Sequence, residues 1–147
     1  MLSNIAIGAI LILMTTAVHA GGMSLALRSV RSQSNTVGSG FHLYRVFSVG
    51  RVVLIMYLVG VVEVLIWAAA YLAFDVVEGF EKAIYFSAVT FTTLGYGDVV
   101  LDGSRRLLSA LEAINGIMMF GWSTAVVIAA VQRVYFSQAA DLHDRPE

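Results

Sequence analysis

The sequence predicts an all-α membrane protein with three bilayer-spanning helices and a short amphipathic segment between the second and the third. Composition is the first observation: of 147 residues, 59% are hydrophobic and 13% are charged, and the mean hydropathy is +0.81. Soluble domains average roughly 45–50% apolar and about 25% charged residues. The second observation is three apolar stretches, each close to the roughly 20 helical residues that cross a bilayer, at 5–27, 52–74 and 107–131.

The same composition excludes several classes of protein. A net charge of −1 provides no basic surface for nucleic acid. The chain has no cysteine, so we expect no disulfides and no thiolate metal site. It also contains no recognisable nucleophile–base pair, no clustered metal ligands and no phosphate-binding loop, so we expect neither an enzyme nor a bound cofactor.

The first apolar stretch, 5–27, is uncharged, and His19 is its only titratable side chain. Val18-His19-Ala20 resembles a signal-peptidase cleavage site. A signal peptide typically begins with positively charged residues, but no Lys or Arg precedes this site. The apolar character also continues beyond the site to Leu27. We therefore expect residues 1–27 to form a retained N-terminal transmembrane helix.

Basic residues predict the orientation. The connector 28–50 and the adjacent Arg51 contain four arginines and no acidic residue. Within the connector, the stretch Ser29 to Gly40 has the composition of a flexible loop. The segment 75–106 contains three Lys or Arg residues and five acidic ones. Since basic loops tend to stay in the cytoplasm, we expect the connector and the short tail 136–147 inside and the N-terminus outside.

A glycine-rich run follows the segment 78–92, which is too short to cross the bilayer. The run reads Thr93-Leu94-Gly95-Tyr96-Gly97. Glycines at alternate positions accept the positive φ angles that other residues resist, which lets successive carbonyl groups point the same way. Backbone carbonyls at membrane depth must be buried in protein or line a wet pathway. Several such strands around one axis would form rings of oxygens that replace the hydration shell of a cation, and Thr93 would add a hydroxyl oxygen at the inner mouth.

This run, followed by Asp98, resembles the selectivity filter of the potassium channel pore-domain family, whose signature is Thr-X-Gly-Tyr-Gly. The resemblance covers residues 51–135 and implies an outer helix, a pore helix at 79–92, the filter and an inner helix, to which the helix 1–27 is an addition. It implies a tetrameric pore made of four identical chains, because one filter strand cannot enclose an ion. It also implies K+ as the permeant ion.

The resemblance gives roles to two side chains beside the filter carbonyls. Tyr96 is expected to pack its ring behind the strand and brace it. Asp98 is expected at the outer mouth, where its charge raises the local cation concentration. Some family members pair this aspartate with an acid in the pore helix, whereas this chain has Val89 at the matching position.

Two glycines, Gly116 and Gly121, lie in the third apolar stretch, where each costs roughly 1 kcal/mol relative to alanine in a helix. By its spacing from the filter, Gly116 matches a hinge glycine of the family's inner helix. Two interpretations stay open for both glycines: a hinge that opens a cytoplasmic gate, or close packing of helices. The same match implies three residues that line the central cavity, namely Ile117, Phe120 and Thr124.

Glu63 and Glu112 each lie near the middle of an apolar stretch, where an unpaired carboxylate is costly. We expect mainly structural roles for them, with proton-linked gating as the alternative. His19 is expected to meet Glu63, and Glu112 to bond the pore helix from behind, with Asn115 on the same face. Three aromatic residues of the second stretch are expected to face lipid or the membrane interface: Tyr57, Trp67 and Tyr71.

Together these features predict a potassium-selective channel that conducts passively in a bacterial inner membrane. Two alternatives remain: a weakly selective cation channel, and a non-conducting scaffold or regulatory subunit that keeps the pore fold. The first apolar stretch lacks the repeated arginines of a voltage sensor. The sequence contains one filter run, whereas potassium transporter subunits typically join several in one chain.

Overall fold

A computed structural model describes residues 2–31, 41–101 and 103–143. It contains four α-helices and one 3₁₀ turn, and the described residues form no strand. The elements are α1 (Leu2–Arg31), α2 (Phe41–Ala73), α3 (Phe80–Phe91), η1 (Gly103–Arg105) and α4 (Arg106–His143). The prediction of an all-α membrane protein is therefore confirmed.

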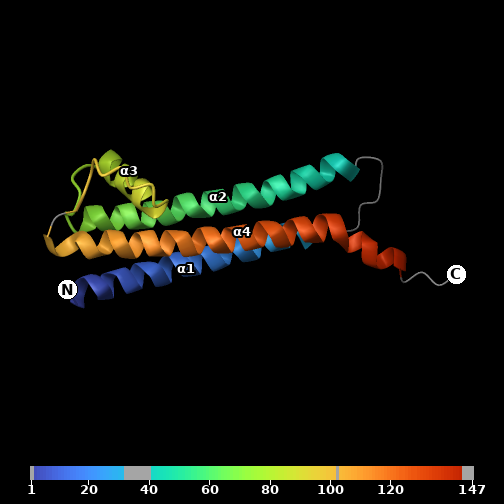
Figure 1. Ribbon diagram of the computed structural model, residues 1–147, viewed down its shortest axis with the longest axis horizontal. Helices are drawn as coiled ribbons and strands as arrows, with labels where there is room; N and C mark the ends of the chain where they lie inside the picture. The colour runs from blue at the N-terminus through green and yellow to red at the C-terminus, as the bar shows by residue number, and fades with distance from the viewer. Residues whose placement is uncertain (1, 32–40, 102, 144–147) are drawn as a thin grey trace.

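The three long helices lie side by side, and the short α3 lies against the end of α2 and the beginning of α4 (Figure 1). The candidate membrane spans are Leu2–Val30, Arg45–Ala73 and Arg106–Tyr135. Only 28% of the most apolar window of each span is buried inside the chain. The remaining apolar surface must be covered by lipid or by other protein, as expected of an integral membrane protein.

The ends of the elements fall into two groups along the long axis (Figure 1). The N-terminus lies at the same end as α3 and the beginning of α4. The beginning of α2 and the C-terminal part of α4 lie at the opposite end. This arrangement agrees with the expectation that the N-terminus and the segment 75–106 share one side of the membrane, while the absolute orientation stays a prediction.

The helices extend further than the apolar stretches predicted. Where a loop was expected, α1 continues to Arg31 and α2 begins at Phe41, and α4 continues into the expected tail as far as His143. Residues 32–40 lie outside the described residues. Helix propagation explains the difference, since each further residue adds a hydrogen bond to an existing helix. Arg51 also ties α2 to α1, donating from Nη2 to the carbonyl oxygen of Ser29 at 2.8 Å.

Two buried apolar clusters hold the helices together. The cluster around α3 joins it to α2 and α4 and includes Trp67, Tyr71, Phe86, Phe91, Leu108 and Met119. The second cluster joins α1, α2 and α4 nearer the other end and includes Ala26, Val30, Val52, Met56, Val126 and Ala130. The first cluster is the one that positions α3 and the run that follows it.

Candidate functional site

The glycine-rich run is attached by its backbone to the last turn of α3. The amide of Thr93 donates to the carbonyl of Thr90 at 2.9 Å, and the amides of Leu94 and Gly95 donate to the carbonyl of Val89 at 3.0 and 3.2 Å. The expected pore helix at 79–92 corresponds to α3 with its two capping residues. The position of α3 therefore determines where the run lies.

The backbone of the run alternates in handedness. The φ angles of Thr93, Gly95 and Gly97 are 59°, 55° and 79°, whereas Leu94 and Tyr96, between them, have no positive φ. Alternating left- and right-handed residues turn successive peptide planes so that their carbonyls share one side. The glycine spacing predicted this conformation at two of the positions.

Thr93 is the position that the glycine pattern did not predict. A β-branched residue rarely adopts a positive φ, and such a backbone conformation costs about 1–3 kcal/mol. The bonds from Thr93, Leu94 and Gly95 to the last turn of α3 fix the conformation locally. Such strain is found where function requires a particular backbone geometry.

The run is exposed in the single chain. Residues 92–98 are all exposed, and the side chains of Leu94 and Tyr96 keep 55% and 67% of their accessible surface. The contact expected of Tyr96, a ring packed behind its own strand, is therefore not made within one chain. Two large apolar side chains exposed on one loop indicate a surface that is covered from outside the chain.

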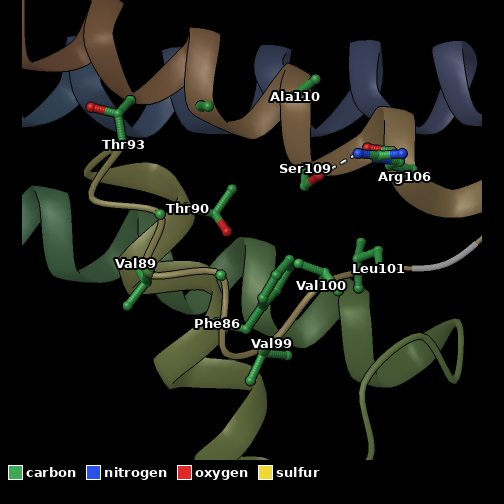
Figure 2. A pocket seen from close by; sticks show the side chains of 13 residues that line it. Phe86, Val89, Thr90, Thr93, Val99, Val100, Leu101, Arg106, Ser109 and Ala110 are labelled. Atoms are coloured by element: carbon green, nitrogen blue, oxygen red, sulfur yellow. Dashed lines mark hydrogen bonds between the residues drawn. The ribbon is translucent and has the colours of Figure 1, made fainter.

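A hollow of about 430 Å³ separates part of the run from α4. Figure 2 shows it between α3, which contributes Phe86, Val89 and Thr90, and the first turns of α4, with residues 99–101 along its edge. Thr93, Gly95 and Gly97 line it from the run. Ser109 donates to the carbonyl of Arg106 at 2.8 Å within α4, so this hydroxyl is already bonded.

Asp98 has a partner that the sequence did not reveal. The hydroxyl of Tyr85 on α3 donates to Oδ2 of Asp98 at 2.7 Å. This bond lowers the pKa of Asp98 below its usual value and raises the pKa of Tyr85. The expected acid partner is missing because position 89 is valine, but Tyr85 lies one helical turn earlier on the same side of α3. The sequence signal that could have identified this partner is a tyrosine hydroxyl four residues before position 89.

Glu112 connects three helices. It lies fully buried on α4, where Oε2 accepts a bond from the hydroxyl of Tyr71 on α2 at 2.6 Å, and Oε1 lies 2.5 Å from the hydroxyl oxygen of Ser87 on α3. The expectation that Glu112 bonds the pore helix from behind is confirmed. The expectation that Trp67 and Tyr71 face lipid is wrong, because both are buried to 1% exposure or less, whereas Tyr57 is 68% exposed.

Helix α1 docks through buried polar contacts. Nδ1 of His19 lies 2.9 Å from Oε1 of Glu63 on α2, as expected. The side-chain amide of Asn115 on α4 donates to the hydroxyl of Thr15 at 2.8 Å. Small residues bring the helices close: a Cβ on Gly8 would overlap Leu111 of α4, and one on Gly22 would overlap Val59 of α2.

The two glycines of α4 have different surroundings. A Cβ on Gly116 would overlap the carbonyl oxygen of Phe91 and lie 2.8 Å from its carbonyl carbon, whereas a Cβ on Gly121 would meet nothing within 4 Å. Close packing therefore accounts for Gly116, and α4 is a continuous helix through both positions. A hinge at either glycine stays a prediction. The residues expected to line a cavity are exposed on α4: Ile117, Phe120 and Thr124.

The contact with Gly116 also gives the depth of α3. Gly116 follows Arg106 by ten residues, which is about 15 Å along a helix axis, or half of a hydrocarbon core of roughly 30 Å. The C-terminal end of α3 thus lies about 15 Å along α4 from Arg106, roughly a third of the way along the span Arg106–Tyr135. The segment between α2 and α4 enters the membrane region as a helix and returns as the alternating run.

A half-length helix followed by such a run, set between two spanning helices, defines a pore-loop membrane protein. Residues 59–133, just over half of the chain, match the family model for ion channels, and the chain belongs to this family. The match begins in α2, includes α3 and the run, and ends in α4, so α1 lies outside it. No curated protein and no solved structure matches the chain.

Proposed function

We propose that the protein is a potassium-selective channel in which residues 93–97 of four identical chains form the filter. The observation that carries the proposal is the alternation of φ at Thr93, Gly95 and Gly97, which aligns successive carbonyls. Rings of carbonyl oxygens replace the hydration shell of a permeating ion. Because one strand cannot surround an ion, the exposed residues 92–98 of the single chain fit a site completed by neighbouring chains.

Two electrostatic features support a cation as the permeant ion. The C-terminal end of α3 carries about half a negative charge from the helix dipole, and it lies about 15 Å along α4 from Arg106, within the span of α4. Asp98, ionised with the help of Tyr85, adds a negative charge just beyond the run. Conduction is passive in this proposal, since ions move between adjacent sites of the filter, and no catalytic step is required.

We further propose that the N-terminus and Asp98 face the outside of a bacterial inner membrane. The chain has no cysteine, so single cysteines introduced at Ser3 and Glu81 report accessibility without interference. Both are expected to react with a membrane-impermeant thiol reagent added to whole cells. Labelling only after the cells are broken would reverse the orientation.

The function is tested by ion flux from proteoliposomes under a K+ gradient with Na+ on the opposite side. Wild-type protein should carry K+ in preference to Na+, and Gly95→Ala should abolish this flux because alanine resists φ of 55°. Gly50→Ala is the matched control, since Gly50 lies within α2 with nothing within 4 Å of an added Cβ. The control should conduct like the wild type.

The same experiment separates the alternatives. Flux of Na+ equal to that of K+, abolished by Gly95→Ala, would indicate a weakly selective cation channel. No flux from tetrameric wild-type protein would favour a scaffold or regulatory subunit that keeps the pore fold. Chemical cross-linking of the reconstituted protein, expected to yield species up to four chains, tests the assembly independently.

A further inference from the structure

The contacts of the buried Glu112 contain more oxygen–oxygen pairs than the neighbouring hydroxyl groups can bridge. Glu112 Oε2 lies 2.6 Å from the hydroxyl of Tyr71, and Oε1 lies 2.5 Å from the hydroxyl of Ser87. The Ser87 hydroxyl also lies 2.8 Å from the carbonyl oxygen of Val64 on α2. All three separations lie within the range of O–H···O hydrogen bonds, about 2.5–3.0 Å.

Counting protons identifies the missing donor. Tyr71 and Ser87 each have one hydroxyl proton, and the carbonyl of Val64 has none. Two protons cannot bridge three oxygen pairs at full strength. The third proton belongs on Glu112 itself, because a protonated carboxyl group gains an O–H donor.

One assignment then satisfies every contact. Tyr71 donates to Oε2 of Glu112, Oε1 of Glu112 donates to Ser87, and Ser87 donates to the carbonyl of Val64. A separation of 2.5 Å between Glu112 and Ser87 fits an acid donating to a hydroxyl as well as a carboxylate accepting from one. If Glu112 were a carboxylate, however, the single proton of Ser87 could bridge only one of its two contacts, with Glu112 or with the carbonyl of Val64. The two oxygens of the other contact would then face each other without a proton.

The surroundings of Glu112 favour the neutral form. Glu112, Tyr71 and Ser87 are all 1% exposed or less, and an ionised carboxylate is costly to bury without a cation. Glu63 pairs with His19, whereas no ion pair joins Glu112 to a cation among the described residues. Tyr71 is the ionisable side chain that bonds Glu112. The other described ionisable side chains of the elements packed against α4 are His19 and Arg28 of α1, Arg45, Arg51, Tyr57 and Glu63 of α2, Glu81, Lys82 and Tyr85 of α3, and Arg105 of η1.

The hydrogen-bonded chain from Tyr71 to Val64 fixes α3 between α2 and α4. Ser87 lies only two and three residues before Val89 and Thr90, whose carbonyls hold the amides of residues 93–95. A displacement of Ser87 would therefore displace the carbonyls that form the filter. We propose that Glu112 is a neutral carboxylic acid and a positioning residue for the filter, whose proton completes the link between α2, α3 and α4. The positioning role rests on the proposed channel function, whereas the protonation state does not.

Infrared spectroscopy tests the protonation state. The wild-type protein at neutral pH should show the carbonyl stretch of a protonated carboxyl group. The band should be lost in Glu112→Gln and kept in Glu63→Gln, which removes the other buried glutamate. Absence of any band that depends on Glu112 would overturn the proposal, whether or not the protein conducts ions.

Selectivity tests the positioning role. Glutamine is uncharged and repeats the hydrogen-bonding pattern of a neutral acid, because its N–H group can donate to Ser87 and its carbonyl can accept from Tyr71. Glu112→Gln should therefore keep the K+/Na+ permeability ratio of the wild type. Ser87→Ala should lower the ratio about tenfold, because it leaves buried groups without partners. Ser24→Ala, in an exposed part of α1, is the matched control and should change nothing.

The outcomes separate the two proposals. A K+-selective wild type with an unaltered Ser87→Ala variant would overturn the positioning role and leave the channel function intact. A large loss of selectivity in Glu112→Gln, in protein that remains tetrameric, would show that a charge is needed and would overturn the neutral acid. A wild type without K+-selective flux would overturn the proposed function and the positioning role, and the infrared band would still decide the protonation state.

Discussion

Helix α4 is held on two sides by different chemistry. On the α3 side, both oxygens of Glu112 have hydrogen-bond partners, and Gly116 touches the backbone of Phe91. On the α1 side, Asn115 bonds Thr15. Three buried polar atoms near this side have no partner among the described residues: His19 Nε2, Glu63 Oε2 and Asn115 Oδ1.

The difference indicates which contacts tolerate change. Buried polar groups that are fully satisfied rigidify their surroundings, and partly satisfied ones contribute less than their number implies. The α3 side positions the proposed filter, and both carboxyl oxygens of Glu112 on this side are satisfied within the chain. The α1 side fixes a helix that lies outside the family match, and its polar atoms use only part of their bonding capacity. We expect changes on the α3 side to affect the fold or conduction more strongly than changes on the α1 side.

The largest effect is expected from Gly116→Ala. The added methyl group would overlap the carbonyl of Phe91, and a backbone group at the end of α3 cannot rotate away as a side chain can. Forcing a methyl into such a contact should cost about 3 kcal/mol. Thermal unfolding in detergent should show a large fall in the midpoint temperature.

Gly121→Ala is the matched control for that substitution, because nothing lies within 4 Å of an added Cβ. In a single chain it should be neutral or slightly stabilising, as replacing a helical glycine by alanine gains up to about 1 kcal/mol. Equal losses of stability in the two variants would mean that the contact with Phe91 does not explain Gly116. Altered gating in Gly121→Ala at unchanged stability would instead favour a hinge at that position.

A smaller effect is expected on the α1 side, from the pair His19 and Glu63. Their side chains lie 2.9 Å apart and fully buried, but each keeps a second polar atom without a partner among the described residues. A double-mutant cycle with His19→Ala and Glu63→Gln should give a coupling energy of about 0.6 kcal/mol and no more than about 1.7 kcal/mol, the range found for hydrogen bonds inside membrane proteins. Chemical unfolding of the four proteins measures it.

A coupling near zero would mean that α1 is held by its apolar contacts and close-packed glycines alone. A coupling above that of any α3-side pair would reverse the comparison. In either case K+ selectivity should change little, because the hydrogen bonds that fix α3 beside the proposed filter involve Glu112, Ser87 and Val64 rather than this pair.

The parts of this arrangement that were predictable from the sequence are those with a local signal. Length and hydropathy predicted the three spanning helices, and alternate glycines predicted the positive φ of Gly95 and Gly97. The isolated polar residues in apolar stretches predicted the pairing of His19 with Glu63 and the role of Glu112 behind α3. A buried polar group needs a partner, and few candidates exist within a membrane span.

The remaining features depend on how helices rotate against one another, which one sequence does not reveal. Trp67 and Tyr71 were expected to face lipid because aromatic residues are common there, but the face of α2 that carries Glu63 also carries them inward. Thr93 gave no sign of its positive φ, since that conformation is imposed by bonds to α3. The extension of α1 and α2 beyond the apolar stretches lacks a compositional signal, because neither arginine nor serine ends a helix.

The smallest effect is expected at the exposed end of the α3 side, where Tyr85 donates a hydrogen bond to Asp98. This bond lowers the pKa of Asp98, so the carboxylate of the wild type stays ionised as the pH falls below the usual range of aspartate. Tyr85→Phe removes the donor and returns the pKa upward. The outer charge is then lost at a higher pH, and K+ flux in an acid titration should begin to fall at a higher pH than in the wild type.

Stability at neutral pH should not change, since both side chains are exposed and Asp98 is ionised in both proteins. Tyr57→Phe, which changes another exposed tyrosine, on α2, should titrate like the wild type. A titration curve unchanged by Tyr85→Phe would show that Asp98 does not influence conduction through its charge, and the α3 side would then act on the filter from its buried contacts alone.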